Sequence, residues 1–181
     1  MGALASILAI ALAPIVVIFS LVFMLDRYER EPIKYLVLSF IFGILIAFPV
    51  VLVELYLQKL LSPELRLNAV IFTALSAGFV VALPEEGFKY IILRLYNYPK
   101  EAFNEPYDGI MYAVAVSMGF AAIENVLYTF EHGMGTGILR AFTAVPAHAA
   151  FAHIMGSVSY THLRAHETSL HLVCRLLLEK K

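Results

Sequence analysis

The sequence predicts an all-α protein that lies in a membrane as a bundle of about five transmembrane helices. Of its 181 residues, 61% are hydrophobic and 15% are charged, and the mean hydropathy is +0.80. A typical soluble domain has about 45–50% apolar and about 25% charged residues. Five predominantly apolar stretches have the roughly 20 residues that a helical span needs. They are residues 3–25, 35–57, 69–96, 109–130 and 136–157.

The first two stretches are almost free of charge. Residues 3–25 contain no charged side chain. Their apolar core is longer than the roughly 7–15 residues of a signal-peptide core, and no basic segment precedes it, so we expect a retained span. Residues 35–57 are interrupted only by Pro49 and Glu54, and we expect a second span there.

The connections between the stretches are short and hold most of the soluble charge. Counted together with the span ends beside them, Lys and Arg slightly favour a cytoplasmic position for residues 26–34 and 97–108, and hence an external amino terminus. The formal net charge of -1, without a basic cluster, gives no electrostatic basis for nucleic-acid binding.

The third stretch carries charges where a span should be apolar. Glu85, Glu86 and Lys89 fall in its middle, and each charge at bilayer depth costs about 2.5–3.5 kcal/mol on insertion scales. On a helix, Glu85 and Lys89 lie about 40° apart and can pair, whereas Glu86 points about 100° away from Glu85. Lys89 alone is explained by an ion pair with a neighbouring helix, but one lysine cannot neutralise two buried carboxylates. The glutamate pair therefore indicates a functional site.

The fourth stretch adds a second polar position inside an apolar run. Glu124 and Asn125 lie there, and Phe120 is one turn before Glu124 on the same face. Gly119 is small enough to let a facing helix approach closely.

The fifth stretch contains two histidines. His148 follows Pro146, which loosens a helix and frees backbone carbonyls that need a polar environment. His153 is five residues further on, lies on another face and is expected to be structural. Polar groups on three spans are least costly when they share one cavity, so we expect His148 to join the glutamates.

Three motifs in three successive spans resemble those of a known family. They are Glu85-Glu86-x-x-Lys89, Phe120-x-x-x-Glu124-Asn125, and His148 followed by Gly156. Together with segments 26–32 and 108–112, they resemble the PrsW family of intramembrane proteases. That family is similar in turn to the CAAX-prenyl-endopeptidase and bacteriocin-protection superfamily. The resemblance covers nearly everything from residue 26 to residue 156.

The resemblance implies a multi-pass protein of a prokaryotic plasma membrane. It implies cleavage of a single-span membrane protein near its extracytoplasmic end, an anti-sigma factor in the known case, so the expected partners are this substrate and the lipid bilayer. Family members usually continue with further spans after the segment 148–156. We therefore expect this chain to be truncated at its carboxyl end.

Peptide hydrolysis needs a base that activates water, an acid for the leaving amine and donors for the oxyanion. A glutamate in a low-dielectric cavity can act as base and then as acid, His148 can position the water, and the Asn125 amide can donate to the oxyanion. The predicted catalytic residues are Glu85, Glu86, Glu124 and His148, supported by Lys89, Asn125 and Phe120.

We favour a mechanism that uses no metal or other cofactor. The alternative is zinc held by Glu85 or Glu86, Glu124 and His148, a ligand set that zinc accepts. The sequence contains no His-Glu-x-x-His helix, so local spacing does not specify a zinc site.

Two other function classes share some of these features. An ion- or proton-coupled membrane transporter also uses intramembrane carboxylates, but it is expected to show an internal repeat and more spans. A non-catalytic membrane interaction protein needs none of the polar groups, and replacing the glutamates would leave its function intact.

The carboxyl end has a different character. Residues 158–168 resemble a translated transposase-type sequencing adapter, and residues 172–181 resemble the flow-cell primer behind it. We therefore predict a protease domain over residues 1–157 and a non-native tail over residues 158–181. Such a tail takes no part in the site and should make few tertiary contacts. It holds His162, His166, His171 and Cys174, the one cysteine of the chain.

Overall fold

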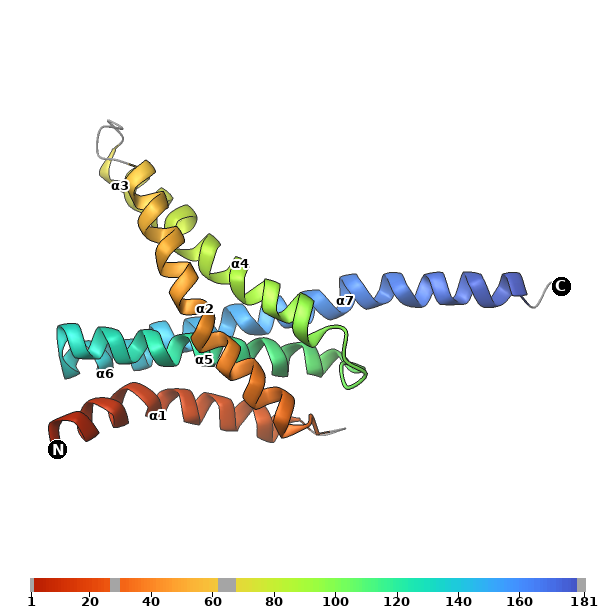
Figure 1. Cartoon of the computed structure of the whole chain (residues 1–181), viewed down its shortest axis with the longest axis horizontal. Coiled ribbons are helices and arrows are strands. Elements are labelled where there is room, and N and C mark those ends of the chain that lie inside the picture. Colours follow the sequence, from red (N-terminus) through yellow and green to blue (C-terminus); the bar gives the residue numbers. More distant parts are fainter. Residues whose placement is uncertain (1, 27–29, 62–67, 179–181) are drawn as a thin grey trace.

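The computed structural model describes residues 2–26, 30–61 and 68–178, with side chains except at residue 3 and residues 162–178 (Figure 1). Every regular element within these ranges is a helix. Five helical segments are long and apolar enough to cross a membrane, and each overlaps one predicted stretch. The segments are Leu4–Leu25, Ile33–Leu60, Ala69–Asn97, Pro106–His132 and Met134–Thr161. The predicted all-α fold with five spans is confirmed.

Helix α5 (Pro106–His132) is the centre of the bundle. In its most apolar window 72% of the residues are buried, against 28% or less in the other four spans. Helices α1 (Gly2–Leu25), α2 (Ile33–Leu60) and α7 (Ala144–Leu178) pack against it, as Figure 1 shows. The outer helices keep many large apolar side chains exposed, as helices that face lipid do.

Helices α2 and α5 cross at a pair of glycines. A Cβ atom on Gly119 of α5 would collide with the carbonyl oxygen of Phe40 of α2, and one on Gly43 would collide with that of Val116. The backbones therefore touch where side chains normally keep them apart. The close approach predicted at Gly119 is confirmed.

The third span is divided into four helical parts. They are α3 (Ala69–Leu75), the π-helix η1 (Ser76–Ala82), α4 (Leu83–Ile92) and the π-helix η2 (Leu93–Asn97). Pro84 has no N–H to donate, and the wider π turn ends just before it, where the N–H of Leu83 bonds to the carbonyl of Gly78. Such turns often lie at functional sites, and here η1 leads directly into the glutamate pair.

The fifth span is broken at Thr143. Helix α6 (Met134–Phe142) ends there and α7 begins at Ala144, so Pro146 falls in the first turn of a new helix. A proline is tolerated in this turn because the first N–H groups of a helix have no intrahelical partner. The loosening expected around Pro146 is thus a complete break, which places Arg140 and His148 on different helices.

The connections that precede α2 and α5 lie at the same end of the bundle. Tyr112 of α5 donates a hydrogen bond to the Glu31 carboxylate, just before α2. Lys100 lies over the rings of Tyr35, at 4.7 Å, and Tyr96, at 3.5 Å. The segments 26–34 and 97–108 therefore meet, as alternation of the spans requires.

Burial beside Asp108 and Asp26 raises the pKa of Glu31 from 4.5 to about 8. Between these pH values the folded protein keeps a proton that the unfolded chain has lost, so stability falls as pH rises through this window. Glu31→Gln should flatten that decline. Thermal unfolding in detergent between pH 5 and pH 8 checks it, with the exposed Glu101→Gln as control. Equal slopes in wild type and Glu31→Gln would contradict the assignment.

The predicted tail begins inside α7. Its first residues pack on the bundle, since Ser159 is buried and the Tyr160 hydroxyl donates to the carbonyl of Asn104 at 3.0 Å. Figure 1 shows the rest of α7 continuing beyond the other helices. The side chains of residues 162–181, with the three histidines and Cys174, lie outside the described residues, so the non-native origin of the segment stays a prediction.

Candidate active site

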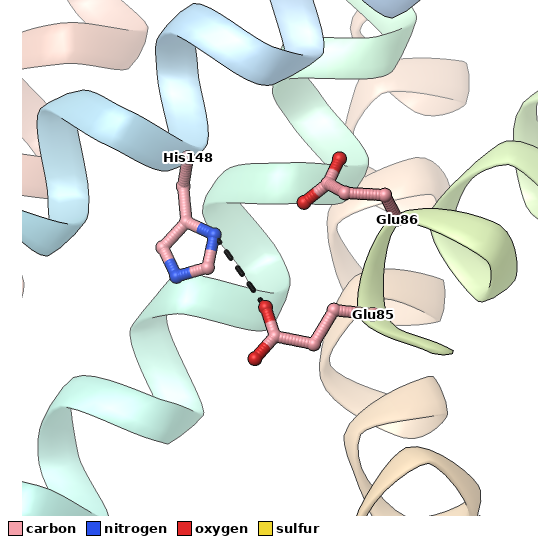
Figure 2. A group of neighbouring side chains, drawn as sticks. All are labelled: Glu85, Glu86 and His148. Atoms are coloured by element: carbon pink, nitrogen blue, oxygen red, sulfur yellow. Dashed lines mark ion pairs between the residues drawn. The ribbon is translucent and has the colours of Figure 1, made fainter. Parts of the chain in front are cut away.

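The four predicted catalytic side chains meet at the middle of the bundle. Glu85 and Glu86 come from α4, Glu124 from α5 and His148 from α7. Figure 2 shows the two glutamates reaching from their helix toward the imidazole, with His148 Nδ1 and Glu85 Oε2 3.9 Å apart. Glu85 and His148 are buried, and Glu86 is partly buried. The structure therefore gathers the polar groups of three spans in one place.

Lys89 lies at the centre of this group. Its side chain is 1% exposed. Its Nζ is 2.7 Å from Glu86 Oε1, 3.0 Å from His148 Nδ1 and 3.5 Å from Glu85 Oε2. The ammonium also stands 4.4 Å from the centroid of the Phe120 ring, where a cation is attracted to the π face. Phe120 thus contacts the ammonium, and its supporting role stays a prediction.

The contacts of His148 determine which ring nitrogen carries the proton. A lysine ammonium only donates, so Nδ1 must accept from Lys89 with its lone pair. Nε2 then carries the hydrogen and donates to Glu124 Oε2 at 2.9 Å. Ser117 holds the same helix turn by donating to the carbonyl of His148 at 2.9 Å. The lone pair of Nδ1 is therefore engaged by Lys89, beside the two glutamates of α4.

Glu124 is held from its other side by Arg140 of α6. The Arg140 Nη2 lies 2.9 Å from Glu124 Oε2, and its Nε donates to the Asn125 side-chain oxygen at 2.8 Å. Asn125 donates in turn to the carbonyl of Ala11 in α1, at 2.9 Å. The Asn125 amide, expected as an oxyanion donor, is thus engaged between α1 and α6. It supports the site by fixing Arg140.

Two charged residues near the site were not singled out from the sequence. Arg140 was not among the expected site residues, although an arginine beside apolar residues is a signal in itself. Glu54 was noted only as an interruption of the second span. It is partly buried on α2 and lies close enough to interact electrostatically with Glu85, Glu124 and Lys89. His153, as expected, takes no part in these contacts.

Glu85, Glu86 and His148 form a group that fits a metal ion. One ligand atom from each of them lies within 4.8 Å of the others. An imidazole that offers one nitrogen and donates its other N–H to a carboxylate is the usual arrangement of a metal-bound histidine. Zinc accepts both carboxylate and imidazole ligands. Glu124, included in the ligand set expected from the sequence, instead lies against the far ring nitrogen.

Comparison with known proteins identifies the family of the chain. A family described as "PrsW family intramembrane metalloprotease" matches residues 31–178. Protease PrsW of Geobacillus kaustophilus is 38% identical over 151 residues, which are 83% of this chain and 64% of that protein. Protease PrsW of Bacillus subtilis is 34% identical over 83% of this chain and 66% of its own length.

The chain thus spans just under two thirds of the length of these relatives. No solved structure shows a significant match to the chain. The family match includes all of α4, α5 and α7, which supply the gathered side chains. The chain belongs to the PrsW family of intramembrane metalloproteases.

Proposed function

We propose that this protein hydrolyses a peptide bond of a single-span membrane protein within the bilayer. The observation that carries the proposal is the meeting of Glu85, Glu86 and His148 around one buried ammonium, with Glu124 bonded to the far ring nitrogen of His148. Charged groups at membrane depth are costly, and a structural ion pair needs only one carboxylate for one lysine. The surplus of acidic groups beside an imidazole is suited to proton transfer during hydrolysis.

Glu85, Glu86 and His148 would hold a metal ion, with zinc as the best fit to these ligands. Zinc in such a site supplies Lewis acidity and lowers the pKa of a water. A glutamate that ligates through one oxygen can take a proton with the other. Glu86 suits this role because its Oε2 is buried and has no hydrogen-bond partner among the described residues. The proton taken from the water would then pass to the leaving amine.

Glu124 and Arg140 would position the imidazole. Because Nε2–H of His148 is fixed on Glu124, Nδ1 stays unprotonated and points toward the glutamates of α4. Arg140 keeps Glu124 in place and balances its charge. These two residues act through His148 and need no contact with the substrate.

The second candidate is a mechanism without a metal, in which Glu85 or Glu86 activates the water directly. One observation favours it: an ammonium already neutralises part of the carboxylate charge. The family description supports the metal-dependent form, which we adopt.

The proposed substrate is a membrane protein with one transmembrane helix, similar to an anti-sigma factor and cut near its extracytoplasmic end. The intramembrane position of the site and the family membership support this class. A soluble peptide would have to enter a region that is surrounded by lipid.

Reconstitution in lipid vesicles with a single-span reporter tests the proposal. Cleavage should occur with the wild-type chain, stop with EDTA and return with zinc, because the chelator removes the ion from its ligands. Protease PrsW of Bacillus subtilis serves as the reference for the reporter. Cleavage that persists in EDTA would favour the metal-free candidate. Ion flux without cleavage would favour the transporter class and contradict the proposal.

A further inference from the structure

The ligand group already contains a cation that belongs to the protein. The three residues suited to hold a metal are Glu85, Glu86 and His148. The atoms they offer to Lys89 are Oε2, Oε1 and Nδ1, at 3.5, 2.7 and 3.0 Å from its Nζ. Lys89 is a triple donor, and each of its three protons has one of these acceptors. The ammonium therefore occupies the space toward which the three ligands point.

A metal and this ammonium cannot be bound together. Carboxylate and imidazole ligands stand about 2.0–2.2 Å from zinc, whereas the same atoms here lie at hydrogen-bond distances from a nitrogen. A metal coordinated by all three residues would overlap Nζ. The ammonium must leave before the ligands can close on an ion.

We propose that Lys89 is a built-in counter-cation, which keeps the ligand group assembled in the metal-free protein and has to withdraw for a metal to bind. The proposal rests on the metal-dependent form of the proposed function. In this state the imidazole is held with Nδ1 unprotonated and the glutamates are drawn together. The protein thus folds around a preformed site without needing the metal.

The charge balance favours the exchange once a divalent ion is available. Two ionised glutamates and one ammonium sum formally to −1, whereas the same glutamates and a divalent ion are neutral. The displaced ammonium is not left without an acidic neighbour, because Glu54 of α2 lies within electrostatic range of Lys89.

The exchange predicts that one substitution raises the affinity for zinc and lowers the stability of the metal-free protein. Lys89→Met removes the competing cation, so zinc should bind about tenfold or more tightly than to wild type, within the usual range of coupling between sites. The metal-free variant should unfold several degrees below wild type, since two buried carboxylates lose their partner. Zinc should raise its unfolding temperature more than that of wild type.

Zinc affinity is measured on purified protein by competition with a chromophoric chelator, together with thermal unfolding with and without zinc. Lys100→Met is the matched control, because Lys100 also lies over aromatic rings but far from the ligand group in sequence and contacts. It should bind zinc as wild type does. Lys89→Arg keeps the charge and should bind zinc no more tightly than wild type. It serves as the test variant if Lys89→Met does not fold.

Weaker or equal zinc binding by Lys89→Met would overturn the proposal and make Lys89 a supporting group of the metal site. Tighter binding by Lys89→Arg would overturn it as well. If no variant binds zinc, the exchange does not exist. Hydrolysis of the reporter in EDTA would then show that the proposed peptidase function survives in its metal-free form.

Discussion

Replacing Glu85 or Glu86 with Gln is expected to lower reporter cleavage by about 10²–10⁴-fold while the protein remains folded. Gln keeps the size and hydrogen-bonding capacity of Glu but is neither a base nor a good ligand for zinc. The loss is expected in the metal-dependent and the metal-free mechanism alike, because both use these carboxylates. Single-turnover cleavage in vesicles separates this effect from weaker substrate binding.

The control for this experiment is Glu131→Gln. Glu131 is an exposed acidic residue near the end of α5, so its replacement should leave cleavage unchanged. Thermal unfolding of each variant shows whether the protein remains folded when one carboxylate is neutralised. Full cleavage by the Glu85→Gln, Glu86→Gln double variant would remove both glutamates from the mechanism.

Much of this site is predictable from the sequence because charge in a membrane is conspicuous. Glu85, Glu86 and Glu124 are visible as costly side chains within apolar stretches, and His148 joins them because shared cavities reduce that cost. The same argument gives the five spans, whose length and apolarity need no tertiary contact to be recognised.

The partners of Glu124 and Asn125 are not predictable in this way. Helix α5 is buried on nearly all sides, so its sequence has no polar face that would show which neighbour each residue meets. Arg140 reaches them only because the fifth span breaks at Thr143 and α6 folds back beside α5. The position of Lys89 among three acceptors likewise depends on α7, which lies far from it in sequence.

The π turns of the third span are a second feature that the sequence pattern did not show. Hydrophobic periodicity over residues 69–96 is compatible with one continuous helix. Pro84 marks a change, but whether a kink, a break or a wider turn accommodates it depends on the packing of α2 and α4. The kind of turn at Pro84 sets the direction in which Glu85 and Glu86 point.

Gly119→Val is expected to cause the largest loss of stability among substitutions outside the site. The Cβ position at Gly119 coincides with the carbonyl oxygen of Phe40, which is backbone and cannot rotate away. Overpacking usually costs about 1–3 kcal/mol and more where the surroundings cannot yield. Helices α2 and α5 must separate, so we expect little folded protein and an unfolding temperature well below that of wild type.

Gly87→Ala is the matched control, because a Cβ at Gly87 of α4 meets nothing within 4 Å and alanine favours a helix over glycine. It should be as stable as wild type or slightly more so.

The smaller Gly119→Ala change tests the consequence for the site. Helix α2 contacts both α5 and α4, so parting α2 from α5 should also draw Glu85 and Glu86 away from His148. Folded Gly119→Ala protein should therefore cleave the reporter less efficiently than Gly87→Ala protein. Wild-type stability and cleavage in Gly119→Ala would show that the α2–α5 crossing does not position the site.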